Sequence, residues 1–119
     1  MATSDSCHFF RKIREAPSLN CAEIALGVYD ACGRELLVVK EPDKKEILHV
    51  FVKMSNGRYV APCGYTSLEA ERTGYFLEEK NETKELTIEE TNITEISENI
   101  DCRSRWRKRV KKWALSYLC

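Results

Sequence analysis

Cys21 and His49 are the residues of this chain whose types and order could supply a thiol nucleophile and its base. Asn20 precedes Cys21 and Glu23 follows it, which predicts a helix beginning at Cys21, with Asn20 as N-cap and Glu23 completing a capping box. A thiol in a first helical turn loses its proton readily, because unsatisfied backbone N–H groups and the positive end of the helix dipole stabilise the thiolate. The sequence therefore predicts a reactive cysteine at this helix terminus.

The imidazole base of such a pair must be His8 or His49, because the chain has two histidines. We favour His49, because it lies on a predicted strand that follows the helix and leads into a hairpin, where its ring can meet the helix terminus. A purely structural role for the two residues is the alternative to a catalytic one. A lone cysteine on an apolar helical stripe usually packs in a core, and a strand histidine is usually a satisfied surface or core group. The order of the two residues, together with the helix cap, makes the catalytic interpretation the one we favour.

The spacing of apolar residues predicts a single α+β domain, with the nucleophile helix packed on an antiparallel sheet. Apolar residues recur at helical spacing from Cys21 to Cys32, and Gly33 is a natural stop for this helix. The turn sequence Ser55-Asn56-Gly57 predicts a hairpin. The expected elements are helices at residues 7–16 and 21–32, strands at 36–39, 47–54, 58–63, 73–77 and 84–89, and a C-terminal amphipathic helix capped by Asn99.

Length and charge limit the classes of function. A chain of 119 residues should form one domain with one core, residues 1–119. The formal net charge of zero argues against nucleic-acid binding as a property of the whole domain. No apolar run approaches the ~20 residues of a membrane span. The first residues also lack the basic and then apolar pattern of a secretory signal, so we expect neither a transmembrane segment nor a signal peptide.

The six cysteines predict reduced thiols rather than a disulfide framework. The chain has enough apolar residues to build a core without cross-links, and no secretory signal is recognised. Their spacings are wide and irregular, with no CxxC pair, so we expect no structural metal site.

The C-terminal segment offers a rival function. Its apolar residues Trp106, Val110, Trp113 and Tyr117 follow one another at helical spacing. The stretch from 103 to 112 holds seven basic residues and no acidic one, and such a helix could bind a membrane, a calmodulin-like partner or nucleic-acid phosphates. We favour a helix that docks on the core, because a domain this small needs these aromatic side chains for its interior.

Three segments of the chain together resemble the core of papain-like and transglutaminase-like cysteine enzymes. They are Leu19–Leu26, which contains the cysteine, Leu48–Val52, which contains the histidine, and Asn56–Val60, which follows the turn. The compact bacterial toxin and effector domains of this kind are the most similar. The resemblance covers roughly residues 18 to 66, about half of the chain.

The resemblance implies thiol-dependent acyl transfer on a protein or peptide amide, by proteolysis, deamidation or transamidation. Cys21 would be the nucleophile and His49 the general base and acid, with the backbone N–H of Cys21 in the oxyanion site and no cofactor. The implied partners are a protein substrate or host protein, and an immunity or regulatory protein. The implied location is the cytoplasm, or a target cell reached by a non-classical secretion route. The alternatives are a catalytically silent interaction module of the same fold and a module that binds membranes or nucleic acid through its basic helix.

The residue that orients the histidine in such enzymes, an Asp or Asn, is expected at position 61, which is alanine here. If the hairpin loop is Ser55–Gly57, then Met54 pairs with Arg58, and Ala61 lies on the same face of the sheet as His49. With the shorter loop Asn56-Gly57, position 61 would point to the other face. We favour the longer loop, because Gly57 then supplies the left-handed residue of a bulge.

The alanine at position 61 leaves three explanations open. The orienting group could come from elsewhere, such as Asp30 or Asp43. The domain could be a natural pseudoenzyme. An aspartate could also have been replaced deliberately to silence the protein.

Overall fold

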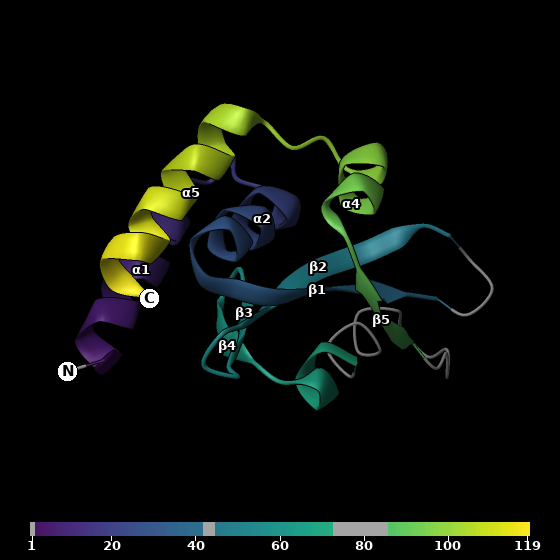
Figure 1. The fold of residues 1–119 in the computed structure, drawn as a ribbon, viewed down its shortest axis with the longest axis horizontal. Helices are drawn as coiled ribbons and strands as arrows, with labels where there is room; N and C mark the ends of the chain where they lie inside the picture. Colours follow the sequence, from purple (N-terminus) through teal and green to yellow (C-terminus); the bar gives the residue numbers. More distant parts are fainter. Residues whose placement is uncertain (1, 42–44, 73–85) are drawn as a thin grey trace.

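An antiparallel sheet with strand order β4-β3-β2-β1-β5 forms the base of the fold in this computed structural model (Figure 1). The structure describes residues 2–41, 45–72 and 86–119. The strands are β1 (Gly33–Lys40), β2 (Ile47–Met54), β3 (Tyr59–Ala61), β4 (Gly64–Thr66) and β5 (Thr87–Thr91). The helices with described bounds are α1 (Ala2–Arg14), α2 (Cys21–Cys32), α4 (Ile93–Asn99) and α5 (Ser104–Tyr117), and residues 68–72 are also helical.

Helix α2 covers one face of the sheet and is itself covered by α5, with α1 beside α5 (Figure 1). The core between these layers includes Leu26 and Val28 of α2 and Val50 and Val52 of β2, all fully buried. Helix α5 approaches α2 closely at Gly27, where an added Cβ would lie 2.5 Å from the side chain of Val110. Glycine at this position therefore allows the C-terminal helix to dock on the nucleophile helix.

The α+β class is confirmed, with α2 on an antiparallel sheet and an amphipathic C-terminal helix. The favoured docking role of that helix also agrees with its packing, since Val110 and Ala114 are fully buried. Asn99 does not cap it. Asn99 ends α4, a helix that the apolar spacing did not predict, and α5 begins after Arg103. The signal for α4 is Asn92, whose side chain accepts a hydrogen bond from the backbone N–H three residues later.

The predicted strands agree with the structure in part. The strand at 47–54 is found with the expected bounds, whereas 58–63 is shortened to Tyr59–Ala61 because the chain turns back into β4. The strand expected at 84–89 is centred later, at β5. The strand expected at 73–77 lies outside the described residues.

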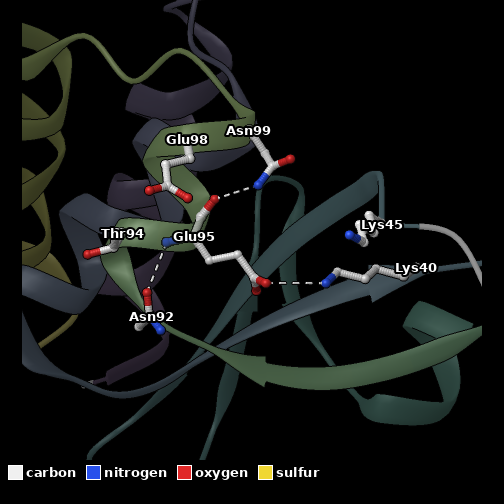
Figure 2. A pocket seen from close by; sticks show the side chains of 7 residues that line it. All are labelled: Lys40, Lys45, Asn92, Thr94, Glu95, Glu98 and Asn99. Atoms are coloured by element: carbon white, nitrogen blue, oxygen red, sulfur yellow. Dashed lines mark hydrogen bonds and ion pairs between the residues drawn. The ribbon is translucent and has the colours of Figure 1, made fainter.

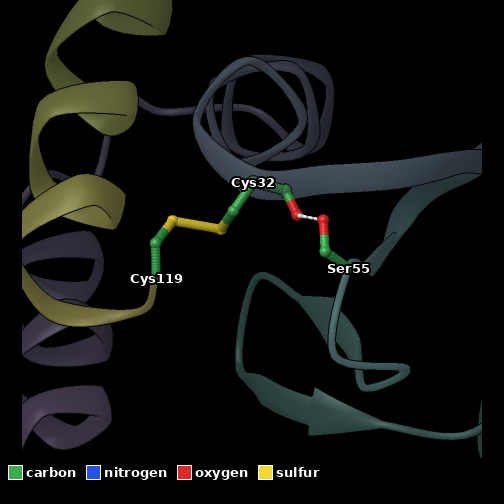
Figure 3. Close-up of a disulfide and its surroundings, with 3 residues drawn as sticks. All are labelled: Cys32, Ser55 and Cys119. Atoms are coloured by element: carbon green, nitrogen blue, oxygen red, sulfur yellow. Dashed lines mark hydrogen bonds between the residues drawn. A yellow bond between two sulfur atoms is a disulfide. The ribbon is translucent and has the colours of Figure 1, made fainter.

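A disulfide joins Cys32 to Cys119, so the prediction of six reduced thiols is wrong for this pair (Figure 3). The end of α2 lies next to the end of the chain, with the Cα atoms of the two cysteines 6.0 Å apart. The two cysteines are 87 residues apart in the sequence, so no local pattern predicts that they pair. The carbonyl of Cys32 also accepts a hydrogen bond from the Ser55 hydroxyl, which ties this corner to the β2–β3 turn.

A second apolar cluster lies on the sheet face that α2 does not cover. Its buried members come from β1, β2, β3 and the residue just before β5: Leu37, Val39, Phe51, Ala61 and Leu86. Phe51 is fully buried, and Ala61 is 8% exposed. Position 61 is therefore an apolar packing position.

Candidate active site

Cys21 is the first residue of α2, at a helix end that is anchored from two directions. Glu23 donates its backbone N–H to the Asn20 side chain (2.8 Å), and the Asn20 backbone N–H donates to the Glu23 carboxylate (3.1 Å), which completes the predicted capping box. Arg103 donates to the same fully buried carboxylate through its backbone N–H (2.8 Å) and its Nε (2.6 Å). The start of α5 thereby fixes the position of the helix end that carries the thiol.

The short β3 strand makes one backbone N–H of β2 available to this thiol. Backbone groups alternate sides along a strand, and the Met54 N–H points toward β3, where it donates to the Arg58 carbonyl. Val50 is four residues earlier and points the same way, but the β2–β3 pairing reaches only to Val52. The Val50 N–H therefore lies beyond the paired region and donates to the sulfur of Cys21.

His49 links the thiol to a carboxylate that sequence reasoning missed. Its imidazole hydrogen-bonds with Cys21, and its Nε2 lies 3.0 Å from Oε1 of Glu71. Both side chains of the ion pair are mostly shielded from water, at 12% and 13% exposure. Because Nε2 is engaged by Glu71, Nδ1 is the nitrogen available to the thiol. The imidazole also stacks on Phe51, with ring centroids 6.4 Å apart, which limits its rotation.

Glu71 comes from the helical residues 68–72 after β4. The Ser67 hydroxyl accepts from the backbone N–H of Ala70 (3.1 Å), and the Ser67 carbonyl accepts from that of Glu71 (3.0 Å). The sequence signal was a serine cap followed by helix-forming residues, which predicts a short helix after β4. Spacing along the chain could not show that this helix lies against His49.

The two titratable groups of the pair shift each other's pKa toward the charged forms. Burial disfavours the Cys21 thiolate, but hydrogen bonds from His49 and from the backbone of Val50 and Ala22 outweigh it, so the pKa of Cys21 is lowered. Burial likewise disfavours the His49 imidazolium, but Cys21 and Glu71 raise its pKa to about 9. Both shifts favour the thiolate–imidazolium pair over the neutral thiol and imidazole.

Ala61 does not leave an empty orienting position beside His49. The register expected for the longer loop is present, since Met54 lies opposite Arg58. Ala61 packs in the apolar cluster beside Phe51, and Glu71 contacts the imidazole instead.

The other carboxylates considered for this role do not supply it. Asp30 binds Arg107 of α5 in a two-point ion pair, at 2.6 and 2.8 Å. Asp43 lies outside the described residues. The second histidine, His8, lies beside Tyr117 with ring centroids 5.6 Å apart, in the layer formed by α1 and α5.

A pocket of ≈ 550 Å³ lies elsewhere, between β1 and α4 (Figure 2). Four of its seven lining residues, Lys40, Asn92, Glu95 and Asn99, bond to one another. Glu95 is contacted by Lys40 (3.4 Å), and the Asn92 and Asn99 side chains bond to the Glu95 backbone. These bonds cap α4 and tie it to the sheet, so we assign the pocket a structural role. Neither Cys21 nor His49 lines it.

Within the part of the chain that the structure describes, no three His, Cys, Asp or Glu residues gather in a way that could hold a metal ion. Among the same residues, no helix has the length and apolar character needed to cross a membrane. Comparisons of the chain with protein-family models, with curated proteins and with solved structures find no match.

Proposed function

We propose that this protein is a cysteine-dependent acyl-transfer enzyme acting on a protein or peptide amide. The observation that carries the proposal is the continuous chain from the Cys21 thiol through the His49 imidazole to the Glu71 carboxylate. A helix-terminal thiol, a base within hydrogen-bond reach and a third group that orients the base are the parts that an activated nucleophile requires. Glu71 takes the role for which position 61 was considered.

The reaction follows from the charges of the pair. The Cys21 thiolate attacks the carbonyl carbon of the amide, and the carbonyl oxygen becomes an oxyanion. The His49 imidazolium gives its proton to the departing nitrogen as the C–N bond breaks, which leaves a thioester on Cys21 and a neutral imidazole. Water or an amine then attacks the thioester, and His49 accepts a proton from it. The acyl group leaves as an acid or a new amide, and the thiolate–imidazolium pair is restored.

The oxyanion needs hydrogen-bond donors near the sulfur. In the first turn of α2, the Glu23 N–H is bound by Asn20, and the Ala22 N–H donates to the thiol. The backbone N–H of Cys21 has no acceptor within its own helix, because it is one of the first donors of the helix. We assign it the role of oxyanion donor.

The papain-like or transglutaminase-like assignment is part of this proposal. It is supported by the resemblance around Cys21 and His49 and by the order of helix, strand and hairpin. A role as a bacterial toxin or effector, with a host-protein substrate and an immunity partner, follows from the same resemblance. The disulfide between Cys32 and Cys119 favours delivery outside the producing cell over a cytoplasmic role, because disulfides persist in oxidising compartments.

The silent interaction module is the principal alternative, and product analysis can separate it from the enzyme. The protein is incubated with a mixture of folded proteins and tryptic peptides, with and without an added primary amine. Mass spectrometry then searches for new chain ends, for deamidated Gln or Asn, and for amine adducts. The enzyme proposal predicts one of these products, absent with Cys21→Ala. Equal product profiles for both proteins would favour the silent module.

A further inference from the structure

A groove of ≈ 320 Å³ between the end of α1 and the start of α5 combines aromatic and basic side chains. Trp106 and Trp113 line it from α5, and both are half-buried. Lys12 lines it from α1, and Arg109 from α5. Each cation lies over an indole, with Lys12 Nζ 5.8 Å from the Trp113 ring and the Arg109 guanidinium 5.0 Å from the Trp106 ring.

The cations of this groove differ from those that hold α5 in place. Arg103 and Arg107 are bound by carboxylates of α2. Lys12 and Arg109, by contrast, make no ion pair within the described residues. Their positive charge is therefore available to an incoming anionic group.

The exposed side of α5 extends this positive surface. Arg105, Arg109 and Lys112 follow one another at i, i+4 and i+7, so they share one face of the helix, and all three are exposed. Glu15 is the only acidic residue that lines the groove. The groove and this row together favour an acidic occupant.

One wall of the groove leads along the chain toward the proposed nucleophile. The segment 16–18 lines it, and Ser18 precedes Cys21 by three residues, which is at most about 11 Å of chain. Arg103 connects the two places, because it lies over Trp106, donates to the Ser18 carbonyl and binds Glu23 at the α2 terminus. A polypeptide bound in the groove could therefore continue toward the thiol.

We propose that this groove binds an acidic segment of the protein substrate, with carboxylates at Lys12 and Arg109 and an apolar side chain against the tryptophans. The proposal rests on the function proposed above, to which it adds a substrate class. A polypeptide fits better than a membrane, because the indoles are half-buried and do not protrude. It fits better than nucleic acid, because the domain has no net positive charge and cations already lie over both indoles.

Binding can be tested without any catalytic activity, in a Cys21→Ser background. The probe is a fluorescent ten-residue peptide of alternating Glu and Leu, and the first control is the same peptide with Lys in place of Glu. The test variant carries Lys12→Glu and Arg109→Glu. Its matched control carries Arg34→Glu and Lys111→Glu, two exposed positions outside the groove with the same change in net charge.

We expect the acidic peptide to bind, the basic peptide not to bind, and the groove variant to bind at least about 10-fold more weakly than its matched control. If charge reversal unfolds the protein, Lys12→Gln with Arg109→Gln makes the same test. No binding of the acidic peptide, or equal weakening in both variants, would overturn the proposal. Binding only to phosphatidylserine vesicles or to a single-stranded oligonucleotide would also overturn it.

A second measurement separates the groove from the chemistry. The acidic peptide is given a chloroacetyl group at one end, and labelling of Cys21 is compared with labelling by chloroacetamide alone. Binding next to the thiol raises the local concentration of the electrophile, so we expect at least about 10-fold faster labelling by the peptide, lost in the groove variant. Peptide binding without product formation would support the groove proposal and contradict the proposed enzyme activity. Product formation without peptide binding would support the enzyme activity and contradict the groove proposal.

Discussion

Cys21 and Cys102 are two free, half-buried thiols that pack against the same core cluster, and their surroundings give them opposite properties. Burial raises the pKa of Cys102 despite the opposing charge of Arg107, and the carboxylates around the thiol act in the same direction as burial. Burial acts in the same direction on Cys21, yet the hydrogen bonds from His49 and the backbone lower its pKa. The difference shows that partial burial suppresses a thiolate unless donors are placed on the sulfur.

Removal of the His49 imidazole should reduce the difference between the Cys21 and Cys102 thiols more than any other change. His49→Gln keeps much of the side-chain volume but removes the base and the cation, so turnover should fall by about 10⁴-fold. The alkylation rate of Cys21 at pH 7 should fall toward that of Cys102. Both quantities can be measured on one sample, by product analysis and by mass-spectrometric mapping of alkylated cysteines. A His49→Gln protein with unchanged Cys21 reactivity would assign the reactivity to the helix terminus alone.

Neutralising the Glu71 carboxylate should lower turnover less than removing the imidazole does. Glu71→Gln retains a hydrogen-bond acceptor for Nε2 but removes the negative charge that favours the imidazolium, so we expect turnover to fall by about 10²-fold. The pKa of His49, followed by NMR titration of the ring, should fall from about 9. Glu69→Gln, an exposed change in the same helical segment, is the matched control. Equal effects of the two variants would contradict a specific role for Glu71.

The sequence resemblance suggests that an aspartate at position 61 would raise turnover, whereas the structure predicts no gain. An aspartate there would enter the apolar cluster beside Phe51, because Glu71 already contacts the imidazole. Ala61→Asp should therefore give no gain in turnover and should lower the free energy of unfolding by about 1–3 kcal/mol. Urea denaturation and the product assay measure the two effects. Higher turnover in this variant would restore position 61 as the orienting site.

The ionised pair also predicts how stability depends on pH. The pKa of His49 is raised from 6.5 to about 9, so its contribution to stability is fully present below about pH 6.5 and is lost as the pH rises through about 9. The difference in urea midpoint between the native protein and His49→Gln should therefore shrink between pH 6.5 and 9.5. A difference that grows over this range would contradict the raised pKa.

Removal of the disulfide should leave the difference in reactivity between Cys21 and Cys102 nearly unchanged. Cys32 lies at the opposite end of α2 from Cys21, so Cys32→Ser with Cys119→Ser should alter the Cys21 alkylation rate less than about 2-fold. The free energy of unfolding should nevertheless fall by about 2–4 kcal/mol, because the unfolded chain gains freedom. If the variant without the disulfide is fully folded but Cys21 loses much of its reactivity, the two ends of α2 are coupled.

Local signals in the sequence were sufficient for the elements that carry the pair. The capping residues Asn20 and Glu23 fix where α2 begins, and the Ser55–Gly57 turn fixes the register of β2 and β3. What the sequence could not provide depends on contacts between distant residues. Glu71 reaches His49 from a helical segment 22 residues later, and Cys32 meets Cys119 across the packed helices. Local patterns set the bounds of elements, but only packing decides which element supplies a third group.

The central claim is that Cys21 exists as a thiolate where an ordinary cysteine does not. Its most direct test is the alkylation rate of each free cysteine between pH 5 and 10, with limiting iodoacetamide and mass-spectrometric quantification. We predict that Cys21 is the fastest site at pH 6 and that its rate levels off at a lower pH than the rate of Cys102, because its pKa is lowered. Cys102 should become reactive only above about pH 9, in keeping with its raised pKa. A Cys21 profile that coincides with that of Cys102, or lies below it, would contradict the account.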